Sequence, residues 1–435
     1  MNEIIKFLKN NFDQYELYEE ENEYKSISYE SNNLKEISIK QSKGFAVRAI
    51  QNKGLTLYST SNYDFEKFKS NFLELSDYPT DTKIIFPKGK NYSNPEVKIF
   101  SEDEFNIPND FFINKIDETI KKILKHFPNA LCDGEYDLGL GQSNLSNSNG
   151  LSKSSKESGI SFFISAQIIN ENDMLNIYDY TSSVKNIENE VIEKITNKLI
   201  ENLSVAQNIK TSPPKGCPVI FTPHGLYQTI LSPLLVSFNG NNLSKNLSTL
   251  SSRENEKIFD EKITIIDNPL IDYSPSSRNF DAEGTNSQIN KLVEEGKFIS
   301  GLFDLKSSSE YGCKPNGCAG RSLGSNTFPS TSNLIMNEGD IGIKKMIDQI
   351  DEGILVDHLL GAGQGNELSG DFSANISLGY KIEKGKIVGR VKNTMISGNS
   401  FKALGNVDYI SNEKENVYGS MSLPYLQTKN VEISS

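Results

Sequence analysis

Residues 24–39 read YKSISYESNNLKEISI, and this stretch decides the fold of the N-terminal part of the chain. Apolar and polar side chains alternate over residues 24–29 and again over 34–39, which is the period of a β-strand with one buried face. The Ser-Asn-Asn sequence at 31–33, between the two runs, is typical of a tight turn. The stretch therefore predicts an antiparallel hairpin.

The segments on either side of this hairpin extend a mixed pattern of strands and helices. Apolar residues recur every three or four positions in the helical segments and every second position in the strands. The expected elements are a helix over 2–12, strands over 44–50 and 54–59, and helices over 110–127 and 186–206. Residues 130–182 alternate like strands, and the Ser/Asn-rich stretch 143–157 within them is expected to be an exposed loop.

A proline-rich segment divides the chain. Residues 211–218 read TSPPKGCP, and neither the prolines nor the glycine can continue the preceding helix. We therefore expect an α+β protein of two domains, residues 1–210 and 218–435. The first should hold an antiparallel-rich sheet with helices, and the second a strand-dominated, barrel-like domain.

Composition excludes several classes of protein. The 435 residues are 36% hydrophobic and 23% charged, as in a globular chain, and the net charge of −12 argues against nucleic-acid binding. The N-terminal segment lacks the features of a signal peptide, and no run of about 18 apolar residues could span a membrane. Four scattered cysteines do not make a disulfide framework. These features favour a soluble cytoplasmic protein.

Metal-binding and nucleotide-binding motifs are weak or absent. The chain has no HExxH or HExxxH sequence, and its three histidines are far apart: His126 ends a helix, His224 lies in a turn where it could cap, and His358 stands alone. Cys313 and Cys318 have no second pair of ligands, so free thiols or a redox pair are the alternatives. The glycine-rich stretch 361–365 lacks the Lys-Ser/Thr ending of a phosphate loop.

Three carboxylates lie in segments of small, turn-forming residues. Asp281, Glu283 and Asp371 could take part in acid–base chemistry. Alternatively, they could accept hydrogen bonds from backbone amides in tight turns. No Ser/His/Asp set and no G-x-S-x-G motif supports an independent hydrolase.

Six segments of the C-terminal half, taken in order, resemble one family. The chain resembles the TldD/PmbA family, also called TldD/TldE and once described as modulators of DNA gyrase. The segments are residues 280–285, 292–304, 332–334, 369–373, 382–387 and 396–399, and residues 44–48, 54–56 and 147–150 fit the family's first domain.

The resemblance identifies the type of subunit. TldD-type chains carry HExxxH on a helix early in the second domain, with a cysteine near the C-terminus, and these residues bind the catalytic metal. Here Ser232 and Ser237 stand in the histidine positions, Pro233 stands in the glutamate position, and no cysteine follows Cys318. Hydroxyl groups do not replace imidazoles as zinc ligands. The chain therefore resembles the PmbA/TldE type, which lacks the metal site.

The resemblance implies a non-catalytic subunit of a cytosolic metallopeptidase complex that degrades or matures unfolded peptides. Its partner would be a TldD-type paralogue that holds the metal, expected to be zinc, while this chain needs no cofactor. The alternative is a stand-alone peptide-binding or regulatory protein acting as a homodimer. Small polar segments that match family motifs are expected to line a shared, peptide-binding cavity, through Asp281, Glu283, Gly284, Gly361, Gly363, Asn366, Ser369, Gly370, Asp371, Phe372 and Ser373.

Overall fold

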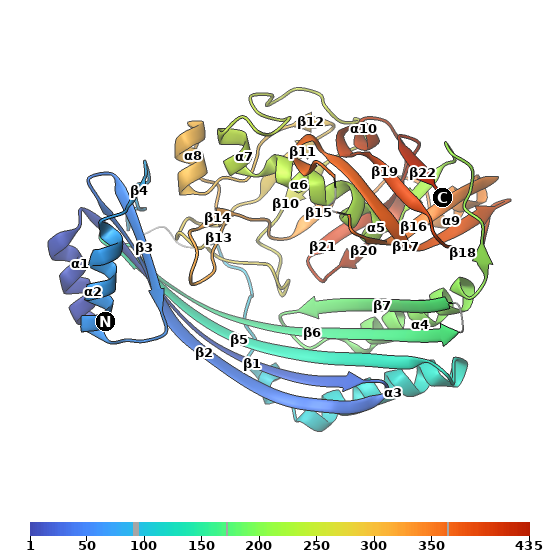
Figure 1. The fold of residues 1–435 in the computed structure, drawn as a ribbon, viewed down its shortest axis with the longest axis horizontal. Coiled ribbons are helices and arrows are strands. Elements are labelled where there is room, and N and C mark those ends of the chain that lie inside the picture. Colours follow the sequence, from blue (N-terminus) through green and yellow to red (C-terminus); the bar gives the residue numbers. More distant parts are fainter. Residues whose placement is uncertain (90–94, 171–172, 363–364) are drawn as a thin grey trace.

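The structure is a computed structural model that describes residues 1–89, 95–170, 173–362 and 365–435. Its N-terminal half is built on a long, curved sheet of seven antiparallel strands (Figure 1). The strand order is β4-β3-β2-β1-β5-β6-β7. The strands are β1 (Gln14–Glu30), β2 (Asn33–Gln51), β3 (Gly54–Thr60), β4 (Thr80–Asp81), β5 (Leu131–Asn147), β6 (Ser152–Asn170) and β7 (Asp173–Ser183).

The predicted hairpin over residues 24–39 is present, within longer strands. Ile27 pairs with Ile37 and Lys25 with Ile39. The exposed loop predicted over 143–157 is wrong, because β5 continues to Asn147 and β6 begins at Ser152. Ser and Asn can occupy the polar face of a strand whose backbone is fully paired, so their abundance did not indicate a loop here.

Four helices of this half cover the first sheet. α1 (Asn2–Asn11) and α2 (Phe65–Ser76) form a small core with Phe45 and Val47 of β2. α3 (Asn109–His126) packs on β1 and β5, and α4 (Asn189–Ala206) packs on β6 and β7, in agreement with the two long helices predicted from periodicity. A short 3-10 turn, Asp103–Asn106, precedes α3.

The C-terminal half contains a second sheet of 13 strands. Its main order is β12-β11-β10-β15-β21-β9-β16-β17-β18-β8, with β19, β20 and β22 attached to β17, β21 and β19. The strands are β8 (Ile209–Lys210), β9 (Val219–Phe221), β10 (Ile265–Asp267), β11 (Asn290–Glu294), β12 (Lys297–Phe298), β15 (Leu334–Met336), β16 (Glu352–Leu360), β17 (Asp371–Glu383), β18 (Lys386–Val391), β19 (Met395–Asn399), β20 (Val407–Val417), β21 (Met421–Thr428) and β22 (Val431–Ser434), with a separate pair β13 (Ala319–Gly320) and β14 (Phe328–Pro329).

Short helices accompany this second sheet. They are α5 (Pro223–Leu226), a π-helical turn (Tyr227–Leu231), α6 (Ser232–Phe238), α7 (Gly240–Ser244), α8 (Leu305–Tyr311), α9 (Ile343–Asp348), a 3-10 turn (Glu367–Ser369) and α10 (Ser400–Gly405). The α+β class with sheets dominating is confirmed. The barrel-like shape needs correction, because the strand order within the described residues is an open path and not a closed barrel.

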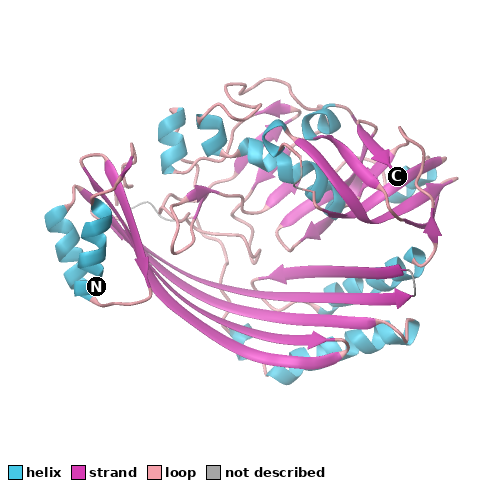
Figure 2. Ribbon diagram, viewed as in Figure 1, coloured by secondary structure: helices cyan, strands magenta, loops and turns pink. Residues whose placement is uncertain are grey.

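The two halves share a hydrophobic core. The core that contains α3 and α4 also contains Leu355, Leu378 and Tyr380 from β16 and β17. In Figures 1 and 2 the C-terminal half lies over one side of the curved sheet, while α3 lies on the other side. The boundary at 211–218 stays a prediction. No helix among the described residues combines the length and apolar character needed to cross a membrane.

Candidate functional site

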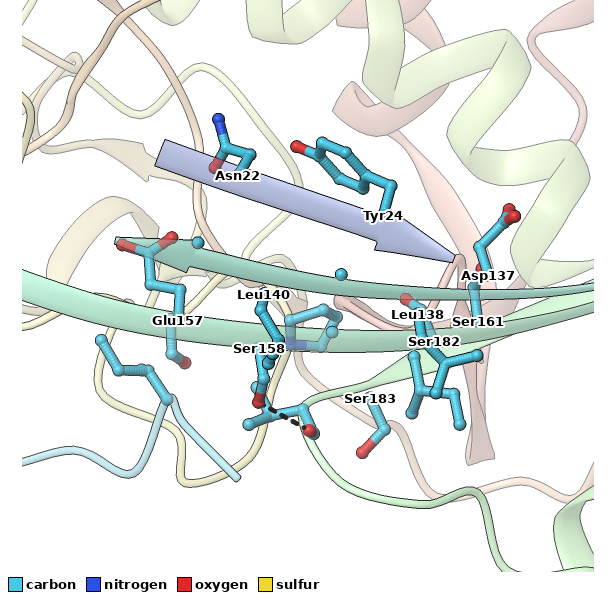
Figure 3. Close-up of a pocket in the computed structure, with 18 of the residues that line it drawn as sticks. Asn22, Tyr24, Asp137, Leu138, Leu140, Glu157, Ser158, Ser161, Ser182 and Ser183 are labelled. Carbon is cyan, nitrogen blue, oxygen red and sulfur yellow. Dashed lines mark hydrogen bonds between the residues drawn. The ribbon is translucent and has the colours of Figure 1, made fainter. Parts of the chain in front are cut away.

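Three glycines lie close together on one face of the first sheet, and one of them, Gly159, faces open space. Gly139 of β5 pairs with Gly159 of β6 and with Tyr24 of β1, and Gly141 pairs with Asn22. A side chain at Gly159 would meet no atom within 4 Å of its Cβ. A cavity of about 330 Å³ lies over this patch, and Figure 3 shows Tyr24, Asp137 and Glu157 around it.

Two more cavities continue the first one. A cavity of about 410 Å³ shares Asn22, Leu140 and Gly141 with it. A third, of about 330 Å³, shares Glu157 and Pro275. We call the three cavities together the groove. Each is near the lower end of the range of about 300–1,000 Å³ that is common for ligand sites, so the groove is large enough for several residues of an extended chain.

Small polar side chains are common in the first and third cavities of the groove, whereas charged side chains, among them Glu21, Glu102 and Lys156, line much of the second. The hydroxyl groups come from both halves of the chain, and they include Ser143, Ser155, Ser158, Ser161, Ser182, Ser183, Ser276, Ser277 and Thr331. The backbone groups of β1, β5 and β6 are already paired with one another. An occupant would therefore be held by side chains and not by added β-pairing. Burial raises the pKa of Glu157, which lies between the first and third cavities.

A buried ion network fixes the C-terminal half onto this face of the sheet. Arg48 of β2 donates to both carboxylate oxygens of Glu16, at 3.0 and 2.8 Å, and to Oε1 of Glu283 at 3.0 Å. The side chains of all three are no more than 2% exposed. Arg321 also donates to Glu16, and Thr327 donates to Glu283 at 2.6 Å. The network holds one wall of the groove in place.

The first group of expected site residues lies in this wall. Asp281 accepts hydrogen bonds from the backbone N–H groups of Glu283, Thr285 and Ala319, and it lines the third cavity. Burial, and then the charge of Glu283, raises the pKa of Asp281 to about 7. Gly284 has a φ of +79° and closes the turn. Asp281 is only 1% exposed, and its hydrogen bonds to backbone amides are those of a tight turn, so Asp281, Glu283 and Gly284 together shape the wall of the third cavity.

The second group lies elsewhere, around the connection from β16 to β17. Asp371 accepts from Oγ of Ser369 at 2.6 Å and from the amide of Asn399 at 2.8 Å, and these hydrogen bonds lower its pKa. Phe372 is buried in the core of the second sheet. Gly361, Asn366, Gly370 and Ser373 belong to the same connection and strand start, and Gly363 lies outside the described residues. The described members of this group do not line the cavities that form the groove.

Two histidines that the sequence separates by 134 positions are neighbours in the structure. The ring centroids of His224 in α5 and His358 in β16 are 5.2 Å apart. Burial lowers the pKa of His224, and Nδ1 of each ring has no hydrogen-bond partner among the described residues. The capping role expected for His224 belongs to Thr222, whose hydroxyl accepts from Gly225 N–H. The only signal in the sequence was the position of His358 in an apolar run.

The stretch expected in place of a metal site does not fit zinc. It forms the end of the π-helical turn and α6, where Pro233 and Ser237 are buried, as are Leu234 and Phe238 of the same helix. Neither a hydroxyl nor a proline offers the nitrogen, thiolate or carboxylate donors that zinc takes. Across the described residues, no cluster of three or more His, Cys, Asp and Glu side chains could hold a metal ion.

Comparison with protein-family models gives two matches. Residues 214–435 match the PmbA/TldA metallopeptidase C-terminal domain, and residues 15–74 match PmbA/TldA metallopeptidase domain 1. The first match alone covers half of the chain.

Individual relatives agree with these matches. An uncharacterized protein of Methanocaldococcus jannaschii is 27% identical over 82% of both chains. A metalloprotease PmbA homolog of Buchnera aphidicola is 23% identical over 86% of this chain and 78% of its own. The fold matches the crystal structure of TldE from Thermococcus kodakarensis over the full length of both chains, with a TM-score of 0.87 and 23% identity.

Proposed function

The chain belongs to the PmbA/TldD metallopeptidase family, and on that premise we propose that it is a non-catalytic subunit which holds peptide for a metal-bearing partner. The partner would be a TldD-type paralogue that supplies the metal, expected to be zinc, and this chain would need no cofactor of its own. The observation that carries the proposal is the groove, a line of three adjoining cavities on a chain whose α6 offers no zinc ligands.

The chemistry of the groove favours an extended, unfolded peptide as its occupant. Hydroxyl and amide side chains can donate to and accept from any peptide backbone, so they bind without strong sequence preference. Within the glycine floor of Gly139, Gly141 and Gly159, the open space at Gly159 leaves room for side chains of different sizes. A folded domain has no free backbone strand to place in such a groove, so unfolded chains would be selected.

The proposal is tested by co-expression with an HExxxH-bearing paralogue from the same genome, followed by a peptide-degradation assay of each chain alone and of the two together. We expect cleavage by the complex and none by this chain alone. Cleavage by the isolated chain, with or without added metal, would contradict the non-catalytic assignment. Peptide binding by a homodimer that never assembles with the paralogue would favour the stand-alone alternative.

Two substitutions at Gly159 locate the peptide. Gly159→Trp places a large ring in the space over the glycine floor, and we expect it to abolish peptide cleavage by an assembled complex. Gly159→Ala is the matched control, because its methyl group meets no atom within 4 Å and should leave cleavage unchanged. A Trp variant that cleaves at the normal rate would exclude the groove. Asp371→Arg tests the β16–β17 connection in the same assay.

A further inference from the structure

Part of β2 forms an open edge of the first sheet. β1 pairs with β2 along its whole length, but β3 pairs only with residues 45–51 of β2. In the described chain, no backbone hydrogen bond joins residues 34–43 to any strand other than β1. We call residues 34–43 the free edge. An unpaired strand of this length presents a row of backbone donors and acceptors to another chain.

The free edge carries exposed apolar side chains. Ile37 is 42% exposed and Ile39 is 60% exposed. Across the ladder to β1, Ile37 pairs with Ile27, which is completely buried in the core beneath α3, and Ile39 pairs with Lys25. The apolar surface of that core therefore continues outward to the edge and stops there without a cover.

The charges of the free edge are only partly used within the chain. Lys35 pairs with Glu30 at 2.7 Å and Lys43 with Glu21 at 2.9 Å. Among the described residues, Glu36 and Lys40 form no ion pair. Lysines on an edge strand usually prevent pairing between chains. Here Lys35 and Lys43 already form ion pairs within the chain, and Lys40 lies four residues from the unpaired carboxylate of Glu36.

The free edge is complementary to itself. In an antiparallel pair of two copies centred on Ser38, Ile37 of one copy faces Ile39 of the other, and Glu36 faces Lys40. Both contacts occur twice by symmetry. The isoleucines then share one face of the joined sheet and the charge pairs share the other, since alternate residues of a strand point to opposite faces. In this register Lys35 faces Gln41, so no like charges oppose each other.

We propose that the free edge is a self-association surface, through which a second copy of this chain continues the seven-stranded sheet by antiparallel pairing of β2 with β2. Cross-strand apolar and opposite-charge pairs stabilise such a ladder, and the backbone hydrogen bonds give it direction. The inference does not rest on the peptide-holding role, because its register is centred on Ser38, although Gln41, Ser42 and Lys43 at the end of the free edge also line the second cavity of the groove.

Sedimentation velocity over a range of protein concentrations tests the proposal. We expect the mass of the chain to rise from 48.5 kDa toward twice that value. Glu36→Lys places lysine opposite Lys40 in both halves of the dimer, and Lys40→Glu places glutamate opposite Glu36. Each single variant should dimerise about tenfold more weakly, equivalent to about 1.4 kcal/mol.

Recombining the charges provides the decisive control. An equimolar mixture of the two single variants pairs every lysine with a glutamate, and so does the Glu36→Lys, Lys40→Glu double variant, so both should regain the affinity of the original chain. Glu36 and Lys40 are exposed, so circular dichroism of the variants should show unchanged folding. A chain that stays monomeric at every concentration, or a dimer that the single variants do not weaken, would overturn the proposal. So would a dimer that the mixture does not restore, or variants that weaken only binding to a paralogue.

Discussion

The two faces of β5 and β6 are built from the same strands and have opposite roles. On one face Tyr136 and Phe162 pair directly, with ring centroids 5.0 Å apart, and both are completely buried under α3 and α4. On the other face, three positions further along, Gly139 pairs with Gly159 and a cavity lies above them. On the core face, large side chains pack and stabilise the sheet. On the groove face, glycines have no side chains, and space for a ligand remains.

Within this single pair of strands, one face therefore contributes to stability and the other to the proposed function. Because the core face supplies the packing, the groove face can tolerate glycine and serine without unfolding the sheet. Beside the groove, the network of Arg48, Glu16 and Glu283 attaches the C-terminal half to the sheet, in addition to the hydrophobic core that the two halves share around β16 and β17. Substitutions on the two faces should therefore differ in both size and kind of effect.

The largest effect is expected on the core face. Phe162→Ala removes a fully buried ring and leaves a cavity against Tyr136, which should lower the free energy of unfolding by about 3–5 kcal/mol. Urea denaturation followed by circular dichroism measures this loss. A loss below about 1 kcal/mol, the size typical of an average substitution, would contradict the packing role of this face.

The next largest effect is expected in the ion network. Glu283→Gln keeps the shape of the side chain but removes the charge that Arg48 and Leu305 N–H bind, and it should lower the free energy of unfolding by about 1.5–3 kcal/mol. The same denaturation experiment measures it. Glu294→Gln, which removes the carboxylate of an exposed i,i+3 pair with Lys291, is a control that should change stability little.

Two glycine substitutions compare the faces directly. On the core face, Gly134→Ala would place its Cβ 2.7 Å from Ile116 of α3, and overpacking of this kind should cost about 1–3 kcal/mol. On the groove face, Gly159→Ala meets open space and should stabilise the strand by about 0.5–1 kcal/mol. Thermal unfolding of the two variants should shift in opposite directions. Shifts of the same sign would show that the faces do not differ as described.

The smallest effect at neutral pH is expected for His224→Phe. His224 lines another cavity, together with Asp179 and Tyr180 of β7. Because burial lowers the pKa of His224, the unfolded chain takes up a proton before the folded chain does. Stability from neutral His224 is therefore present above about pH 6.5 and lost as pH falls below it. The Phe variant should lose less thermal stability between pH 7.5 and 5.5. An equal loss in both proteins would exclude His224 as the titrating group.

The sequence by itself determined the α+β class, the first hairpin, the two long helices and the family. These features follow from periodicity over ten to twenty residues and from motifs in order along the chain, and both are local properties. It also indicated the tight turn at Asp281, because that turn is encoded in consecutive positions. It failed over 143–157, where polar residues fill one face of paired strands and resemble a loop.

Only the tertiary structure decided which distant residues meet. Arg48 and Glu283 are 235 positions apart, and no local pattern predicts that they form one ion pair. The same holds for His224 and His358, which come from a helix and a strand of the second sheet, and for the glycine floor, which becomes a groove only because C-terminal loops border it. The physical reason is that periodicity specifies which face of a helix or strand is buried. Which residues that face then contacts depends on how the two sheets pack together.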